Sequence, residues 1–473
     1  MKNKNFTRRD FIRTTSGVMA GTILANPITA LGKRPAAQKK KLALVGTGVR
    51  GTSFWGRNIQ RNYSDVAEFV GLCDINPGRL EYGKNFIGTD CPTFTDFDEM
   101  MDTANPDILM VTTVDSTHHE FIIKGLERNI DVITEKPLTT DEQKCQAILD
   151  AEQASEGTLI VGFNYRYSPH HTRIKELLMN ERVGRITSVD FHWYLNVYHG
   201  ASYFRRWHGE ADKGGTLLVH KATHHFDLIN WWLDSDPVEV FAEGDLEHYG
   251  HNNEFRGNNC RDCQYKDQCK FHWDITRSQR DMDLYVNNEQ HDGYLRDNCL
   301  WREEIDIYDK MSVQVKYANN VQVNYSLTTY SPYEGMKIGF NGMDGRIDAW
   351  HGIPWRDEAK ISQEQLHEQE MSQEEQEEAV NYEEIMVMDN FASEHELIKV
   401  RQSGGGHGGG DVRLQDQIFR NPDMDDPLKL AAGSRDGAMS ILVGIAARKS
   451  IETGQPVRIE DLVSLTPHPT RGA

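Results

Sequence analysis

The segment KKLALVGTGVRG (residues 40–51) joins a short apolar run to glycines at positions 46, 48 and 51. The apolar run predicts a buried strand, and the segment TSFWGRNIQRN that follows can form a helix. Glycines at this spacing let the backbone approach a pyrophosphate at the N-terminus of the helix. The segment therefore predicts the start of a dinucleotide-binding Rossmann domain. Its candidate cofactor-binding residues are Gly46, Gly48, Val49, Arg50 and Gly51.

A second apolar strand, AEFVGLCD (67–74), ends in Asp74. A carboxylate at this position accepts hydrogen bonds from the ribose hydroxyls of the cofactor and repels a 2′-phosphate. The sequence therefore predicts NAD as the cofactor. Arg79 follows closely and can pair with a 2′-phosphate, so NADP stays open.

Strands and helices continue to alternate after Asp74. Apolar runs at 107–113, 131–137 and 158–164 predict strands, and the segments 118–129 and 141–155 predict helices. Such alternation is typical of an α/β fold with a doubly wound parallel sheet, whose ligand binds at the carboxyl ends of the strands. We expect this domain to span residues 41–163. Polar candidates at those strand ends are Thr113, His118, Glu135, Lys136 and Asn164.

The segment VHKATHHFD (219–227) combines three histidines with a lysine and an aspartate. On one continuous helix His220, His224 and Asp227 would share a face, a spacing that suits either a metal ion or proton transfer. Histidine titrates near neutrality without perturbation, as acid–base chemistry on an alcohol requires. The H-E-x-x-H pattern of zinc proteases needs a glutamate where Lys221 stands, and a cation disfavours a metal ion. We therefore expect His220 and His224 to be catalytic and to bind no metal ion.

The chain has 473 residues, 52 of them basic and 72 acidic, and a formal net charge of −20. This length indicates two or more domains. The negative charge argues against nucleic acid and anionic membrane surfaces as partners. We also expect no membrane span, because no apolar run reaches the roughly 18 residues that a span requires.

The N-terminal segment has the parts of a targeting signal. Arg8 and Arg9 in TRRDFIR (7–13) precede the apolar stretch TTSGVMAGTILA (14–25) and the small-residue sequence ITA (28–30). This order resembles a twin-arginine export signal with its cleavage site. We expect residues 1–30 to direct export to the periplasm and residues 31–40 to form a linker.

The seven cysteines fall into two groups. Cys73, Cys91 and Cys145 lie in the predicted Rossmann domain, where we expect buried apolar side chains. Four others lie in a polar segment, residues 255–300, named here the Cys-rich insertion. They are Cys260, Cys263, Cys269 and Cys299. Either a structural zinc site or two disulfides fits this group, and both remain open.

Two further segments are unusual in composition. The acidic insertion (357–384) contains ten glutamates, and we expect a solvated helical or mobile segment. The glycine-rich segment SGGGHGGGD (403–411) surrounds His407 with six glycines and ends at Asp411. Glycines allow either a flexible linker or a close approach of the backbone to a sugar, and both readings remain open.

The chain resembles the glucose–fructose oxidoreductase/inositol dehydrogenase (Gfo/Idh/MocA) family. The resemblance rests on GTGVRG, TTVDSTHHEFIIKGLERNIDVITEKPLTT, VGFNYRYSP, GGTLLVHKATHHFDLINWWL and DGAMSILVGIAARKSIETGQPVRI, in this order. It implies a C-terminal α+β domain (164–430) with an open, largely antiparallel sheet, used for substrate binding and homo-oligomerisation. A C-terminal helix and closing segment (431–463) would follow.

The same resemblance assigns roles to three residues. Lys136 of the E-K-P triplet would contact the nicotinamide ribose and the substrate hydroxyl, and burial would favour its neutral form. His224 would be the general acid–base residue. His220 stands where the family has an aspartate, which leaves the substrate class undetermined. The glycine-flanked His407 is similar to one in the NAD-dependent glycosidase branch, glycoside hydrolase family 109.

These observations lead to three functional hypotheses. The first is an NAD-dependent oxidoreductase that removes hydride from a carbinol carbon of a sugar or glycoside and retains its cofactor tightly. The second is an NAD-dependent glycoside hydrolase that works by transient oxidation at C3 followed by elimination. The third is a non-catalytic module that binds carbohydrate or nucleotide.

Overall fold

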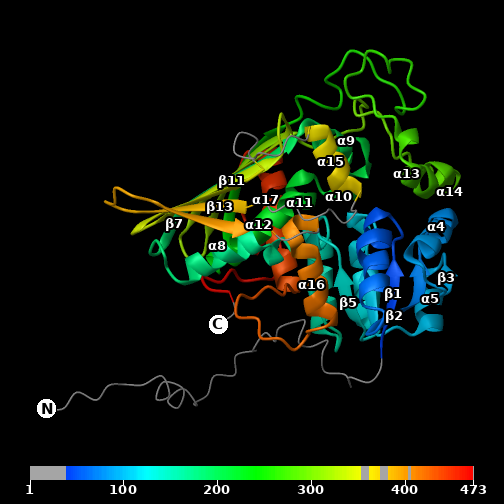
Figure 1. Cartoon of the computed structure of the whole chain (residues 1–473), viewed down its shortest axis with the longest axis horizontal. Coiled ribbons are helices and arrows are strands. Elements are labelled where there is room, and N and C mark those ends of the chain that lie inside the picture. Colours follow the sequence, from blue (N-terminus) through cyan, green and yellow to red (C-terminus); the bar gives the residue numbers. More distant parts are fainter. Residues whose placement is uncertain (1–38, 353–361, 373–381, 403–405, 472–473) are drawn as a thin grey trace.

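The computed structural model describes residues 39–352, 362–372, 382–402 and 406–471. The predicted export signal (1–30) lies outside the described residues, as do nearly all of the linker, the side chain of His407 and much of the acidic insertion. The described residues form two sheet-containing domains that pack against one another (Figure 1). A single cluster of buried apolar residues includes members from both domains, such as Val45 and Val313.

The first domain is a six-stranded parallel sheet in the order β3-β2-β1-β4-β5-β6, as expected for a doubly wound Rossmann fold. Because all strands run the same way, their carboxyl ends lie along one edge. The strands are β1 (Lys40–Val45), β2 (Ala67–Cys73), β3 (Thr93–Phe94), β4 (Ile108–Val111), β5 (Asp131–Thr134) and β6 (Leu159–Val161). The connecting helices are α3 (Asn58–Asn62), α4 (Pro77–Ile87), α5 (Phe97–Ala104), α6 (His118–Glu127) and α7 (Glu142–Gln153).

The helix expected after the glycine turn begins as a π-helix (Gly51–Arg57) and becomes α-helical only in α3. The wider turn buries six successive residues, Gly51 to Gly56, which the single stripe of an amphipathic α-helix would not bury. The indole of Trp55 thereby reaches Glu135 at the end of β5, with Nε1 donating to Oε1 at 2.8 Å.

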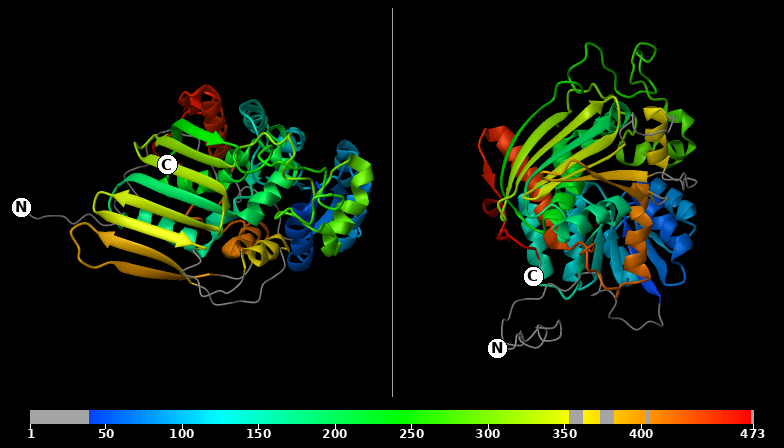
Figure 2. Two further views of the ribbon diagram at one scale, coloured as in Figure 1. Left: turned by 90° about the horizontal axis from the view of Figure 1, so that it is seen from above. Right: turned by 60° about the vertical axis from the view of Figure 1, so that its left-hand side comes forward.

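The second domain contains a nine-stranded sheet in the order β14-β13-β12-β11-β7-β10-β9-β8-β15. Among the described strands of this sheet, only β10 and β7 pair in parallel, so the expected open, largely antiparallel sheet is confirmed (Figure 2). Buried and exposed residues alternate along β9 and β10, because helices cover one face of the sheet. The strands are β7 (Ile186–Asn196), β8 (Pro237–Asp245), β9 (Lys310–Tyr317), β10 (Gln322–Ser331), β11 (Gly335–Gly342), β12 (Gly345–His351), β13 (Tyr382–Asp389), β14 (Glu396–Arg401) and β15 (Val457–Arg458).

The long helix α17 (Ser434–Thr453) connects the two domains. It packs on β8 and α12 of the second domain and on α7 and β6 of the first. The other helices of the second domain are α8 (Pro169–Met179), α9 (Val197–Arg205), α10 (Ala211–Gly214), α11 (Leu217–His220), α12 (Ala222–Leu233), α13 (Gln279–Leu284), α14 (Glu289–Asp292), α15 (Gln363–Ser372) and α16 (Gly410–Phe419).

The segment VHKATHHFD does not form one continuous helix. Helix α11 ends at His220, and α12 begins at Ala222 after a break at Lys221. The expectation that His220, His224 and Asp227 share one helical face is therefore wrong. The carboxylate of Asp227 instead forms a buried two-point pair with Arg166, with Nε to Oδ2 at 2.8 Å and Nη2 to Oδ1 at 2.5 Å.

Candidate active site

The glycine turn follows β1 and is shaped by close backbone contacts. Gly46 has a positive φ of 93°, and a Cβ there would lie 2.6 Å from the Thr112 carbonyl oxygen. A Cβ at Gly51 would lie 2.1 Å from the carbonyl oxygen of Gly46. At Gly48 the nearest atom to an added Cβ is the Tyr285 hydroxyl oxygen at 3.7 Å. The turn thus needs Gly46 and Gly51 for packing and leaves room at Gly48 for a phosphate group.

Asp74 at the end of β2 is fixed by the turn. Its Oδ2 accepts hydrogen bonds from the Thr47 amide at 2.8 Å and the Thr47 hydroxyl at 3.1 Å. Arg79 donates to Oδ1 of Asp74 at 3.1 Å and pairs with Asp292 of α14 at 2.5 Å. Two carboxylates thus neutralise Arg79. This arrangement favours the ribose hydroxyls of NAD over the 2′-phosphate of NADP.

Lys136 follows β5 and meets His220 of the second domain. The ammonium nitrogen Nζ lies 3.4 Å from Nε2 of His220 and donates to its carbonyl oxygen at 3.1 Å. The other ring nitrogen of His220, Nδ1, lies 2.5 Å from Oδ2 of Asp115, which follows β4. These contacts connect Asp115, His220 and Lys136 in series across the two domains.

Burial dominates the ionisation of this series. It lowers the pKa of Lys136 to about 8, against the opposing effect of the Asp115 and Glu135 charges. Burial, followed by the charge of Lys136, holds the pKa of His220 well below its usual value. Burial likewise raises the pKa of Asp115 well above its usual range. A lysine with a pKa near 8 can exchange a proton at neutral pH, which an ordinary lysine does not do.

His224 has different surroundings from His220. Its ring stacks on Tyr165 with centroids 4.2 Å apart and planes 13° apart, and 4% of the residue is exposed. His225 stacks on Trp193 and contacts the Tyr325 hydroxyl at 2.8 Å, as expected for a structural histidine. The geometry therefore places His220 beside Lys136. The acid–base role of His224 stays a prediction.

Glu135 and Arg50 hold the glycine turn against the next strands. Arg50 contacts Glu135 at 2.5 Å and Asp411 at 3.5 Å, and Asp411 accepts from Nδ2 of Asn164 at 2.5 Å. A Cβ at Gly410 would lie 2.3 Å from the Asn164 carbonyl oxygen. The described end of the glycine-rich segment thus packs against the cofactor edge, the edge of the Rossmann sheet where the carboxyl ends of its strands lie. This packing favours a part in the binding site over a flexible linker.

The candidate residues Thr113 and His118 form hydrogen bonds in the loops that follow β4 and β5. His118 has Nδ1 2.8 Å from the Pro137 carbonyl oxygen and Nε2 3.2 Å from the Thr113 carbonyl oxygen. Burial lowers the pKa of His118, and a neutral ring has one N–H, so it donates to only one of these two carbonyl oxygens. The Thr113 hydroxyl accepts from Thr117 at 2.9 Å. Direct contact of Thr113 or His118 with a cofactor remains a prediction.

Both domains match models of one protein family. Residues 40–163 match the NAD-binding Rossmann fold of an oxidoreductase family, and residues 175–459 match its C-terminal alpha/beta domain.

The chain belongs to the Gfo/Idh/MocA family of oxidoreductases. It is 36% identical over 444 residues to YteT of Bacillus subtilis (strain 168), an oxidoreductase by name, in a match that covers 90% of this chain and 99% of YteT. It is 23% identical over 215 residues to an inositol 2-dehydrogenase/D-chiro-inositol 3-dehydrogenase of Lactiplantibacillus plantarum (strain ATCC BAA-793 / NCIMB 8826 / WCFS1). That match covers 45% of this chain and 58% of the relative.

Solved structures share the fold at low identity. A levoglucosan dehydrogenase in complex with NADH and levoglucosan superposes with a TM-score of 0.62 at 16% identity, over 89% of this chain and 100% of that one. A myo-inositol 2-dehydrogenase from Lactobacillus plantarum gives a TM-score of 0.57 at 16% identity, over 89% and 99%. As in the family, residues 40–163 form an NAD-binding Rossmann domain.

Several residues of this Gfo/Idh/MocA site escaped the sequence reasoning. Asp115 could have been found from the sequence, because it lies just after the predicted strand 107–113, at the edge of the sheet where the ligand is expected. Tyr285 of the Cys-rich insertion carried no such signal, yet its hydroxyl accepts from the Val49 amide at 3.1 Å. His208 and Arg206 of the second domain also lie near His220. His199 lies beside Glu334 and His367 in the same domain.

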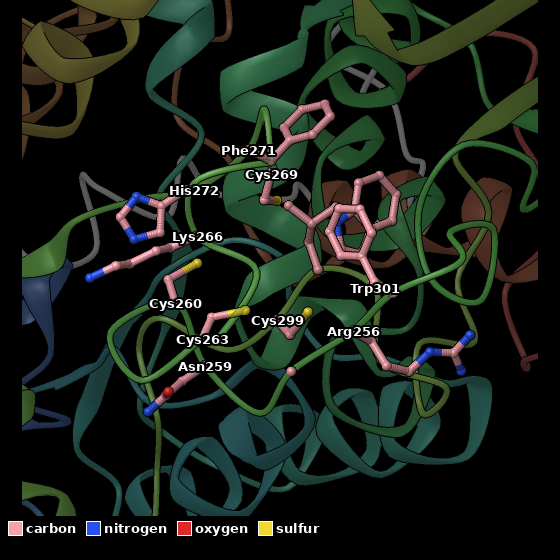
Figure 3. A pocket seen from close by; sticks show the side chains of 13 residues that line it. Arg256, Asn259, Cys260, Cys263, Lys266, Cys269, Phe271, His272, Cys299 and Trp301 are labelled. Atoms are coloured by element: carbon pink, nitrogen blue, oxygen red, sulfur yellow. The ribbon is translucent and has the colours of Figure 1, made fainter.

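The four cysteines of the Cys-rich insertion line one small cavity of about 20 Å³ (Figure 3). The three cysteines of the Rossmann domain are buried, as expected, and all seven are free thiols. Among the described residues, no group of three His, Cys, Asp or Glu side chains is placed to hold a metal ion. The cavity has room for one or two water molecules. The zinc and disulfide hypotheses both stay predictions.

No helix in the described part of the chain is long and apolar enough to span a bilayer.

Proposed function

We propose that this protein is an NAD-dependent oxidoreductase that removes hydride from a carbinol carbon of a sugar or glycoside. The series Asp115–His220–Lys136 carries the proposal, because it puts a lysine of lowered pKa at the cofactor edge of the Rossmann sheet. Two solved neighbours support the substrate class, since their names and titles describe dehydrogenases of levoglucosan and myo-inositol. The relative of Lactiplantibacillus plantarum is an inositol dehydrogenase by name.

The residues of the chain would manage the proton of the reaction. NAD, when bound at the glycine turn, supplies the hydride acceptor. Lys136 in its neutral form takes the proton of the substrate hydroxyl as the carbinol C–H bond breaks and the ketone forms. His220 keeps a neutral ring beside Lys136, because its pKa is well below the usual value, and Asp115 fixes that ring through Nδ1.

Aromatic rings surround the proposed reaction centre. The rings of Tyr203, Trp207 and His208 lie 5.4, 5.8 and 4.2 Å from the His220 ring, centroid to centroid. Apolar faces beside a few placed polar groups are typical of small-molecule sites and suit the C–H face of a sugar. The rings also exclude water from the proton path.

The export signal motivates a retained cofactor. A protein folded before export can carry NAD across the membrane, and a bound cofactor favours a cycle that returns its hydride. The contact of Tyr285 with the glycine turn supports retention, because the Cys-rich insertion covers part of the cofactor edge. We place the mature protein in the periplasm on the strength of residues 7–30 alone.

A second candidate is glycoside cleavage with no net oxidation. Oxidation at C3 would acidify the C2 proton, elimination would release the C1 substituent, water would add, and the hydride would return to C3. The packing of Gly410 and Asp411 on Asn164 favours this candidate, because it brings the glycine-rich segment to the cofactor edge.

The deciding experiment uses mature protein purified without added cofactor. Release of NAD(H) by denaturation gives the bound amount per chain, and a panel of sugars and glycosides is then added with no external NAD. Reduction of the bound cofactor supports the oxidoreductase, and release of an aglycone without net reduction supports the glycosidase. The Lys136→Ala variant separates an enzyme from a binding module. An enzyme would lose turnover, whereas a binding module would keep its ligand affinity and show no turnover in either form. A chain that binds neither NAD nor sugar would contradict the proposal.

A further inference from the structure

Arg206 is a cation close to the proposed reaction centre that the proposed mechanism does not use. It follows α9, and its guanidinium carbon lies 4.9 Å from the ring centroid of Tyr203. The same Tyr203 ring lies 5.4 Å from the ring of His220, which contacts Lys136. Two side chains, Tyr203 and His220, therefore stand between Arg206 and the lysine that would take the substrate proton.

Arg206 lacks the carboxylate partners that several other arginines of the described residues have. Arg50, Arg79 and Arg166 each contact two carboxylates. Among the described residues, none places a carboxylate oxygen within 4.0 Å of the Arg206 guanidinium. Its Nε donates to the Ser202 carbonyl oxygen at 2.8 Å, which leaves both Nη groups for another acceptor.

The charge around Arg206 is positive, although the chain as a whole carries −20. Burial and then the charge of Arg296 hold the pKa of Arg206 at about 10, below its usual value. Arg296 is the charged group that acts most strongly on Arg206. A half-buried cation that lacks a counter-ion is costly unless a ligand supplies one.

We propose that the substrate of this site is a uronic acid or a uronoside, whose carboxylate binds the two Nη groups of Arg206 while a ring hydroxyl faces Lys136. The inference rests on the proposed oxidoreductase function and names its substrate class. A guanidinium presents two parallel donors that match the two oxygens of a carboxylate.

The alternative acceptor is a phosphate of the cofactor, and the position of a second arginine argues against it. Arg296 lies over the Tyr285 ring, with its guanidinium carbon 4.8 Å from the centroid, and Tyr285 touches the glycine turn. Arg206 instead lies over Tyr203, which faces His220. Arg296 is thus on the pyrophosphate side and Arg206 on the reaction side.

Calorimetric binding to the mature protein with its NAD content measured tests the inference. The probes are glucuronate, galacturonate and their methyl glycosides, each matched with its neutral hexose, and glucose 6-phosphate. We expect the uronates to bind at least about tenfold more tightly than the neutral partners, a difference that Arg206→Gln removes and Arg206→Lys partly keeps. The NAD content should not change. Arg458→Gln, in an exposed pair with Glu460, is the control.

The inference is overturned if the neutral sugars bind as well as the uronates, if no uronate binds, or if glucose 6-phosphate binds more tightly. Loss of bound NAD in Arg206→Gln would assign this arginine to the cofactor and would also overturn it. Thermal unfolding of both Arg206 variants shows whether they are folded. Turnover of a neutral sugar would keep the oxidoreductase proposal and reject the uronate. Uronate binding that depends on Arg206, without any reduction of NAD, would keep the uronate as the ligand and reject the oxidoreductase proposal.

Discussion

The ammonium nitrogen of Lys136 lies 3.4 Å from Nε2 of His220, although 84 residues separate them in the chain. Lys136 follows a strand of the Rossmann sheet, and His220 ends a helix of the second domain. Neither domain alone contains both groups, so the packing of the domains brings them together. Because the pKa of Lys136 is lowered, its role can be tested by substitution and by the dependence of the rate on pH.

Replacement of Lys136 by methionine should abolish hydride transfer and leave the fold intact. The general-base contribution of such a group is typically about 10² to 10⁴-fold, and kcat should fall by that order. NAD content and thermal unfolding should stay near those of the parent, since methionine keeps the length of the side chain. Lys213→Met, at an exposed lysine that pairs with Glu210, is the matched control. Turnover that survives in Lys136→Met would remove this lysine from the mechanism.

The rate of oxidation should increase with pH through about 8, the pKa of Lys136, because the lysine must lose its proton before it can accept another. The Asp115 charge raises the pKa of Lys136. Asp115→Asn should therefore shift the increase in kcat/KM to lower pH. The profile is measured from about pH 6 to about pH 10. A profile that Asp115→Asn leaves unmoved would show that Asp115 acts only on packing.

Loss of the Tyr285 hydroxyl should weaken cofactor retention. This hydroxyl accepts from the Val49 amide and can donate its own hydrogen to a phosphate oxygen at the turn. Tyr285→Phe should therefore lower the amount of NAD(H) that copurifies and speed its release, seen as decay of bound NADH fluorescence. Tyr382→Phe, at an exposed tyrosine of β13, is the control. Tighter retention in Tyr285→Phe would mean that the hydroxyl competes with the cofactor for the amide.

The buried pair of Arg166 and Asp227 should be important for stability. Both side chains are 1% exposed, and Arg166 also contacts Asp436 at 2.9 Å. Arg166→Met would leave the buried Asp227 without its cation, whereas Asp436 keeps Arg471 at 3.0 Å, and the free energy of unfolding should fall by about 3–5 kcal/mol. Arg458→Met removes an exposed pair and should cost less than about 1 kcal/mol. Equal losses in the two variants, measured by denaturant unfolding, would contradict the argument.

Acid should destabilise the fold through its buried histidines. Burial lowers the pKa of His170 and of His171 to about 4. The unfolded chain then binds protons that the folded chain does not, so stability is lost as the pH falls from about 6.5 towards 4. At pH 5 each such histidine should cost about 2 kcal/mol.

His170→Gln removes one of these titrations, and its stability should depend less steeply on pH in thermal unfolding. Glu383, whose Oε2 lies 3.5 Å from Nδ1 of His170, has a raised pKa from burial and acts in the opposite direction. The comparison with the parent protein isolates the histidine. A pH dependence as steep as that of the parent protein would exclude His170 as a source of the acid sensitivity.

The Rossmann domain was predictable because local patterns determine it. Apolar runs, the glycine spacing and the acid at the end of β2 are signals contained in short windows of sequence. Asp115 was accessible to the same reasoning. The contact of Tyr285 with Val49 was not, because it joins residues 236 positions apart through an insertion without regular periodicity.

The histidine segment shows a different limit of sequence reasoning. Its composition is compatible with one continuous helix, and periodicity gave no sign of the break at Lys221. The break follows from tertiary contacts, since His220 is held by Asp115 and by Lys136. Helical spacing is a weak guide wherever such contacts compete with the helix.

The break at Lys221 also separates two histidines that a continuous helix would couple. Each added residue of an α-helix turns the side-chain direction by about 100°, so one insertion between His220 and His224 would otherwise misplace both. With the helix interrupted, the residue beside the lysine and the residue on the aromatic stack can change independently. Each histidine is therefore held by partners of its own, His220 by Asp115 and Lys136, and His224 by the Tyr165 ring.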